Sequence, residues 1–147
     1  MHSIPHPEHP RPDLQREPWH SLNGPWDFAP DPQDQGLGQE WWQRTDWPAE
    51  ILVPYPVGSE LAGVPEIDAP RAVYWYRRRF DLPDEMRDRC LRLHFGAADH
   101  HARVWLNGVL LGDHEGGYTP FSFDITEIVR ARDNHLVVRV ADSRSMR

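Results

Sequence analysis

The stretch Arg-Val-Trp-Leu-Asn-Gly-Val-Leu-Leu-Gly, residues 103–112, decides the fold class of this chain. Its centre is an Asn-Gly pair between two apolar runs. This is the strongest short-range signal for a two-residue β-hairpin, because both central residues of such a turn adopt positive φ. The predicted register pairs Leu106 with Val109, Trp105 with Leu110 and Val104 with Leu111.

The two faces of this hairpin differ in character. Side chains alternate along a strand, so Val104, Leu106, Val109 and Leu111 share one aliphatic face, which we expect in the core. Trp105 and Leu110 pair on the opposite face, which is also apolar. We expect that second face to be a docking surface for something outside this domain. Trp105→Ala should then disturb the folding of the chain less than Leu106→Ala.

Other short apolar alternations, separated by turn signals, indicate further strands. No long helical pattern and no strand–helix–strand rhythm is present, so the sequence predicts an all-β sandwich. Residues 40–44 form a short aromatic run that we expect to be a helical turn laid against the sandwich. Arg78 shares a strand face with Tyr74, Tyr76 and Phe80, and must be paired or at the sheet margin. The predicted strands lie within residues 26–28, 51–54, 73–82, 91–95 and 136–140, and residues 116–126 are predicted as a loop that runs into a short strand.

Composition narrows the class of protein. The chain has 147 residues and a formal net charge of -7, which argues against nucleic acid or an anionic membrane as partner. Cys90 is the one cysteine, so no disulfide framework or thiolate metal cluster is expected. No signal-peptide pattern opens the chain, and we expect a cytoplasmic protein. Residues 1–18 are rich in proline and predict an extended arm; residues 19–147 predict one domain.

Five motifs in order resemble one known module. Together they are similar to the N-terminal sugar-binding domain of family 2 glycoside hydrolases, the family of β-galactosidases, β-glucuronidases and β-mannosidases. The last motif is most similar to β-glucuronidases. The motifs are residues 22–28 (Leu-Asn-Gly-Pro-Trp-Asp-Phe), 75–80 (Trp-Tyr-Arg-Arg-Arg-Phe), 93–97 (Leu-His-Phe-Gly-Ala), 104–108 (Val-Trp-Leu-Asn-Gly) and 114–121 (His-Glu-Gly-Gly-Tyr-Thr-Pro-Phe).

This resemblance implies a jelly-roll, galactose-binding-like β-sandwich that precedes an immunoglobulin-like domain and a catalytic (β/α)₈ barrel. In such enzymes two glutamates of the barrel carry out retaining hydrolysis of a β-glycoside. Neither glutamate is in this chain, which we expect to be inactive alone and to shape or support the active site of the complete enzyme. The family pattern also continues beyond residue 147, so we expect the sandwich to lack at least one closing strand. No cofactor is expected.

Sugar sites combine an aromatic platform with polar groups, because a sugar ring presents both C–H faces and hydroxyls. Residues of the right types are Trp75, Trp105, His114, Glu115 and Tyr118. We expect them to contact carbohydrate or to pack against a neighbouring domain. His94, Asp99, His100, His101 and His114 are candidate metal ligands, but adjacent histidines on a strand point to opposite sides, which favours solvated side chains and no metal site.

Two other functions stay open. The chain could be a freestanding carbohydrate-binding module that uses Trp75, Trp105 or Tyr118. It could also be a structural module, because a sandwich without its closing strand exposes unpaired backbone groups that favour homodimers.

Overall fold

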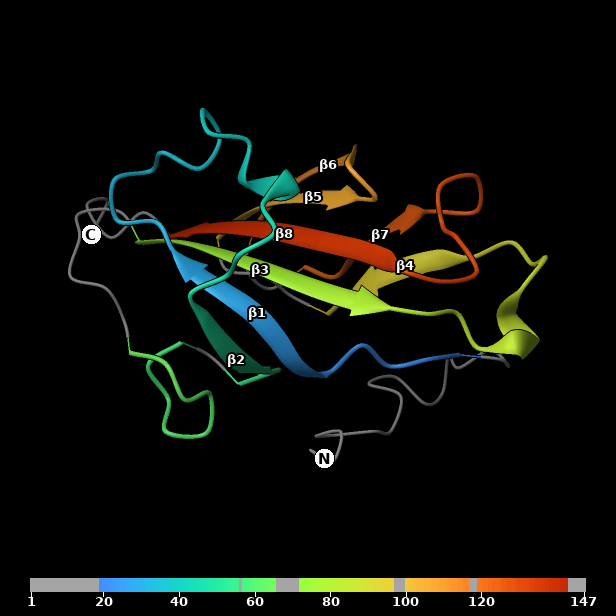
Figure 1. Cartoon of the computed structure of the whole chain (residues 1–147), viewed down its shortest axis with the longest axis horizontal. Coiled ribbons are helices and arrows are strands. Elements are labelled where there is room, and N and C mark those ends of the chain that lie inside the picture. The colour runs from blue at the N-terminus through green and yellow to red at the C-terminus, as the bar shows by residue number, and fades with distance from the viewer. Residues whose placement is uncertain (1–18, 56, 66–71, 97–99, 117–118, 143–147) are drawn as a thin grey trace.

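The computed structural model describes residues 19–55, 57–65, 72–96, 100–116 and 119–142. The predicted arm, residues 1–18, and Tyr118 lie outside the described residues. Within them the chain is an all-β jelly-roll sandwich, as predicted (Figure 1). The strands are β1 (Gly24–Pro30), β2 (Ala49–Val53), β3 (Ala72–Phe80), β4 (Arg92–Phe95), β5 (His101–Leu106), β6 (Val109–Glu115), β7 (Phe121–Asp124) and β8 (Asn134–Asp142), with 3-10 turns η2 (Trp41–Gln43) and η3 (Asp84–Met86).

Six strands form one antiparallel sheet in the order β2-β1-β3-β8-β5-β6, and β4 pairs with β7 in a second, two-stranded sheet. The main core lies on the face of the large sheet that carries Phe28, Leu106 and Leu136, all at most 2% exposed. Leu93 of β4 and Phe123 of β7 pack into the same core, so the small sheet covers this face. We call it the inner face.

Strand β3 shows why the large sheet is apolar on both sides. It pairs with β1 on one side and with β8 on the other, so it lies in the middle of the sheet. Tyr74 and Tyr76 point into the main core, while Val73 and Trp75 belong to a second buried cluster on the opposite, outer face. A strand buried on both faces needs large apolar side chains at successive positions, and this strand has them.

The hairpin between β5 and β6 confirms the predicted turn, since Asn107 and Gly108 have φ of 52° and 82°. Leu106 pairs with Val109 and Trp105 with Leu110, as predicted. The third pair is wrong, because Val104 lies opposite Gly112 and a β-bulge places the extra residue at Leu111. Gly112 has φ 154°, and a Cβ there would lie 3.0 Å from the Phe123 ring, so a glycine allows the small sheet to pack closely beside the bulge.

Val109 is a second correction. Val104 and Leu106 are fully buried and Leu111 packs against the main core, but Val109 is 47% exposed. It lies at the turn end of β6, the last strand of the large sheet among the described residues.

The remaining local predictions agree with the structure. Trp26 and Phe28 are both buried on β1, and residues 41–43 form the expected helical turn. Asp124 or Thr126 is the residue type expected to cap the turn after β7, and the structure shows Asp124 in this role, since its carboxylate accepts the backbone N–H of Thr126 at 3.0 Å. Among the described residues, no helix has the length and hydrophobicity required to cross a membrane.

Candidate functional site

The outer face of the large sheet is covered by the segment between β1 and β2, residues 31–48, which we call the cover segment. It leaves the end of β1, crosses over β8 and β5, and returns to β2 (Figure 1). Its residues Leu37, Trp41, Trp42 and Trp47 pack on the second buried cluster, which contains Trp75 and Trp105.

Four indoles make up the centre of this contact. Trp75 and Trp105, from β3 and β5, stack with ring centroids 5.3 Å apart and an angle of 21°. Trp42 of the cover segment stacks on Trp105 at 5.1 Å and 6°, and Trp41 packs on Trp75 at 5.9 Å. We call the series Trp75, Trp105 and Trp42 the indole stack. It leads from the buried sheet surface outward to the cover segment.

A buried carboxylate fixes the start of the cover segment. Asp31 is fully buried, and its side chain accepts three hydrogen bonds of 2.9 Å, from the backbone N–H groups of Gln35 and Gly36 and from Nε1 of Trp75. Gly36 lies directly on the indole, because a Cβ at this position would be 2.6 Å from the Trp75 ring. The loop conformation and the position of Trp75 therefore depend on each other.

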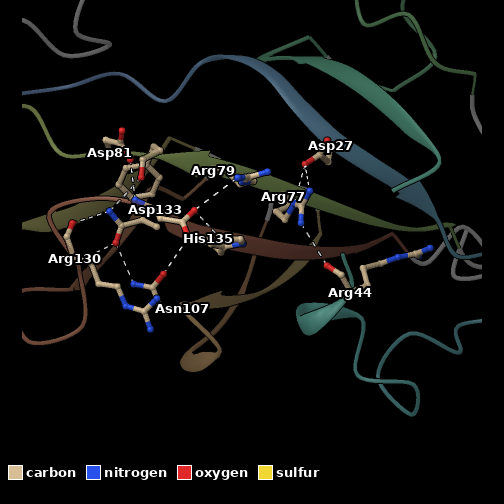
Figure 2. Close-up of polar contacts among 11 residues, drawn as sticks. Asp27, Arg44, Arg77, Arg79, Asp81, Asn107, Arg130, Asp133 and His135 are labelled. Carbon is tan, nitrogen blue, oxygen red and sulfur yellow. Dashed lines mark hydrogen bonds and ion pairs between the residues drawn. The ribbon is translucent and has the colours of Figure 1, made fainter. Parts of the chain in front are cut away.

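Two arginines of the sheet hold the same segment, one through an ion pair and the other through a backbone contact. Nη2 of Arg139 lies 2.6 Å from Oδ1 of Asp34, and its side chain is only 3% exposed. Arg77 pairs with Asp27 at 2.7 Å and donates to the carbonyl of Arg44 at 3.4 Å, as Figure 2 shows. The Arg44 guanidinium in turn lies 4.4 Å from the centroid of the Trp41 ring, a cation–π contact.

These contacts correct the prediction for two candidate residues. Trp75 is 0% exposed and Trp105 is 4% exposed, so neither offers a free platform to a sugar or to another domain. The sequence pattern identified the outer face as apolar, which is right, but the chain covers that face itself. The sequence-based reasoning missed the partner because residues 31–40 carry turn signals and no periodicity.

The other candidates do not join them. His114 of β6 is half-buried and stacks on Phe121 at 4.2 Å, on the inner side of the large sheet. Glu115 is exposed and lies opposite His101 in the register of β5 and β6. The described candidates are therefore split between the two faces of the sheet. In the described part of the chain, no three His, Cys, Asp or Glu side chains gather as metal ligands would.

One open groove does lie on the outer face, beside the indole stack. Its volume is about 420 Å³, and we call it the Trp42 groove. Arg103 at its side is held by Asp113 through two hydrogen bonds, 2.7 Å from Nε and 2.8 Å from Nη2. These bonds lower the pKa of the Asp113 carboxyl and raise the pKa of Arg103. The groove is lined by Leu37, Trp42, Arg103, Trp105, Gly108 and Leu110.

Of the residues that line this groove, only Trp105 is among the candidates predicted from sequence, and Trp42 and Arg103 are not. The sequence signal that could have pointed to Trp42 is the Trp41-Trp42 pair, because two adjacent indoles on a short turn are unusual. Which of the two rings would face outward depends on the sheet contacts of each, and the sequence does not show these.

A second hollow, of about 500 Å³, lies where β1 begins and β3 ends, and is lined mainly by charged side chains. Several of its charged side chains pair with one another. Arg77 pairs with Asp27, Arg79 lies 3.8 Å from Asp133, and the backbone N–H of Asp133 donates to Asp81 at 2.8 Å (Figure 2). Mutual neutralisation of this kind indicates a structural role.

Asn107 and Asn134 form a buried amide network that ties the hairpin turn to β8. Oδ1 of Asn107 accepts the backbone N–H of His135 at 2.9 Å, and its Nδ2 donates to Oδ1 of Asn134 at 3.1 Å. Asn134 is fully buried and its Oδ1 also accepts the N–H of Arg130 at 2.7 Å. Asn107 therefore serves both the positive φ of the turn and the long-range contacts drawn in Figure 2.

Arg78 is predicted to be paired or at the sheet margin, and the structure shows a hydrogen-bonded side chain. Its Nη1 donates to the carbonyl of Pro25 at 2.7 Å, and burial lowers the pKa of its guanidinium. This contact joins β3 to the start of β1, so it has a structural role.

With this geometry established, comparison with known proteins identifies the family. Residues 42–146 match the family described as glycosyl hydrolases family 2, sugar binding domain. The chain belongs to that family. The resemblance inferred from the five motifs is thus confirmed, and the indole stack and the Trp42 groove are features of a family 2 sugar binding domain.

Relatives of this family 2 domain are long enzymes. The chain is 33% identical to the β-glucuronidase of Paenibacillus borealis over 135 residues, which is 89% of the chain and 22% of that protein. It is 34% identical to human β-glucuronidase over 119 residues, or 74% of the chain and 18% of the relative. The chain thus spans about a fifth of the length of these proteins.

Solved structures of β-glucuronidases also match this chain over a part of their length. A β-glucuronidase of Ruminococcus gnavus in complex with uronic deoxynojirimycin matches 84% of the chain, and 21% of its own, with a TM-score of 0.72 and 29% identity. A β-glucuronidase of an uncultured Clostridium species matches 81% of the chain, and 21% of its own, with a TM-score of 0.68 and 33% identity.

Proposed function

We propose that this chain is the non-catalytic N-terminal domain of a β-glycosidase that acts on β-glucuronides. In that enzyme it shapes or supports the active site of a separate (β/α)₈ barrel. The observation that carries the proposal is the match of most of the chain to about a fifth of several β-glucuronidases, in the family of their sugar binding domain.

The side-chain contacts support a non-catalytic role. Retaining hydrolysis needs two carboxyl groups about 5–5.5 Å apart, one of which must reach the anomeric carbon. Here Asp31 is sealed in the loop contacts with Trp75, while Asp34 is held by a buried arginine. Asp113 is engaged by Arg103. These acidic side chains hold the fold together, which suits a domain that supports chemistry carried out elsewhere.

A domain exchange tests this function. The matching N-terminal region of the Paenibacillus borealis β-glucuronidase is replaced by this chain, and hydrolysis of p-nitrophenyl β-D-glucuronide is compared among the chimera, the wild-type enzyme and a version with the region deleted. We expect the chimera to retain kcat/KM within about tenfold of wild type, a loss of about 1.4 kcal/mol. We expect the deleted version to lose activity, and the isolated chain to show none.

Two outcomes contradict the proposal. Hydrolysis of the glucuronide by the isolated chain would show that the domain is itself catalytic. A chimera that folds and elutes as the wild-type enzyme does, but has no activity, would show that this chain does not support a β-glucuronidase barrel.

A second candidate function is a self-association module. Val109 and Leu110 are 47% and 53% exposed on β6, the last strand of the large sheet as described. Exposed apolar side chains on such a strand favour pairing with another copy. Light scattering across a concentration series tests it: dimers that disappear in a Leu110→Lys variant support this role, and a monomer at all concentrations contradicts it.

A further inference from the structure

The Trp42 groove has the composition of a small saccharide site. We propose that it binds one pyranose ring of a neutral β-linked glucoside, which stacks on Trp42 while its hydroxyls contact Arg103 and Asp113. This goes beyond the support of a barrel, since it assigns a ligand to the outer face of this domain itself. The groove volume of about 420 Å³ lies in the range of small-molecule sites, about 300–1,000 Å³.

The first argument is the placement of the Trp42 ring. One face of the ring is stacked on Trp105 within 6° of parallel, and the residue is half-buried and lines the groove. Trp105 is itself fixed between Trp42 and Trp75 by stacking. The platform is therefore rigid before any ligand arrives, which lowers the entropic cost of binding.

The second argument is the polar pair beside the platform. Arg103 has five guanidinium N–H groups, and Asp113 engages two atoms, Nε and Nη2. The side chains of Arg103 and Asp113 are 32% and 38% exposed, so hydroxyls can reach both. A held arginine and a held carboxylate supply donors and acceptors side by side, which matches neighbouring hydroxyls of a sugar, each of which both donates and accepts.

The third argument selects the class of sugar. In a β-glucoside the ring substituents are equatorial, so both ring faces are flat C–H surfaces that can lie on an indole. Arg103 and Asp113 neutralise each other, and the chain carries a formal net charge of -7. An anionic uronate would meet the Asp113 carboxylate and the net negative field without an unpaired cation in the groove lining. The geometry therefore favours a neutral ring.

The test is a titration of the purified 147-residue chain with cellobiose, observed through the indole N–H signals in ¹H–¹⁵N NMR spectra. The Trp42 signal is assigned by its absence in Trp42→Phe. We expect this signal to move with a Kd on the order of 1 mM, as befits a single stacked ring. Methyl β-D-glucuronide should bind at least about fivefold more weakly, because of the repulsion described above.

Variants of adjacent residues separate the site from the fold. Trp41 lies next to Trp42 on the same turn, is also half-buried and packs on Trp75 at a tilted angle of 57°, but it does not line the groove. Trp42→Ala should weaken cellobiose binding at least about tenfold, the effect of losing a stacking contact of about 1.4 kcal/mol. Trp41→Ala should leave the Kd unchanged. Arg103→Ala keeps the platform and should weaken binding about threefold to tenfold.

Several results would overturn this inference. One is a Trp42 signal that does not move at cellobiose concentrations far above the expected Kd. Another is an equal loss of binding in Trp41→Ala and Trp42→Ala, which would reflect general unfolding of the cover segment. Tighter binding of the glucuronide than of cellobiose would refute the neutral class. The NMR titration does not depend on the activity of the chimera. The saccharide site and the proposed role in a β-glucuronidase can therefore each be refuted without the other.

Discussion

The two faces of the large sheet are both buried, but they are covered in different ways. The inner face packs against strands β4 and β7 and against aliphatic and aromatic side chains. The outer face is covered by residues 31–48, whose one regular element is the 3-10 turn Trp41–Gln43. Strand pairing orders the inner layer through its backbone, whereas the outer layer depends on particular polar side chains: Asp31, Asp34, Arg77 and Arg139. In the cover segment, where strand pairing does not fix the backbone, buried charged side chains and indole stacking fix the conformation.

The largest expected effect tests whether both faces are core. Leu106 faces inward and Trp105 outward, yet both are at most 4% exposed. We therefore expect Leu106→Ala and Trp105→Ala to lower the free energy of unfolding by similar amounts, about 3–4 kcal/mol each. Urea unfolding followed by circular dichroism measures both. A loss below about 1 kcal/mol for Trp105→Ala alone would show that the cover segment contributes little.

The next effect sharpens the role of the polar contacts. Asp31→Ala leaves the Trp75 indole N–H and two backbone N–H groups without their acceptor in a buried site, and should cost about 2–4 kcal/mol. Asp46→Ala is the matched control, because Asp46 lies in the same segment, is exposed, and receives the Arg44 guanidinium on its backbone carbonyl. Thermal unfolding should separate the two variants clearly. Equal melting temperatures would refute the importance of the Asp31 carboxylate.

A smaller effect concerns the ion pair of Asp34 and Arg139. Asp34→Ala leaves the buried Arg139 guanidinium without this partner, and we expect a loss of about 1–3 kcal/mol, since Asp34 is itself partly solvated. The double variant Asp34→Ala/Arg139→Met removes the uncompensated charge and should recover most of that stability. A double variant less stable than the single one would indicate that Arg139 contributes mainly through packing.

The smallest effect is at the exposed pair of Arg103 and Asp113. Asp113→Asn should lower the free energy of unfolding by less than about 1 kcal/mol, and less at high salt. Hydrogen bonds from Arg103 lower the pKa of Asp113 below its ordinary value of 3.8. Its contribution is therefore present above about pH 3.8 and is lost as the pH falls through the lower pKa of the folded state. Stability curves of wild type and variant should converge there; a gap that persists in strong acid would assign the effect to packing.

The comparison of the two faces also explains what sequence could predict. Strand positions, the Asn107-Gly108 turn and the short turn around Trp41 follow from periodicity and local turn chemistry, and all are present. The Leu111 bulge does not follow, because it lies beside a close contact between Gly112 and Phe123 of the other sheet, which no local pattern contains. Local pattern cannot report a contact that depends on a distant ring.

The candidate site was harder still to predict. Strand alternation correctly predicts Trp105 as an apolar residue on a second face. What covers that face is encoded in residues 31–48, whose order comes from contacts such as Arg139 with Asp34, 105 positions apart. Proline, glycine and aspartate in such a segment indicate a loop, and a loop is normally assumed to be exposed. The ring that does face the groove, Trp42, could only be distinguished from Trp41 once the sheet was in place.

The indole stack has one consequence for observing this protein. Three indoles in near-parallel contact interact electronically, so their absorption and circular dichroism are properties of the group and not of single rings. One member belongs to the cover segment and two belong to the sheet. Any opening of the outer layer therefore separates coupled chromophores, and the chain has a label-free optical reporter for that motion.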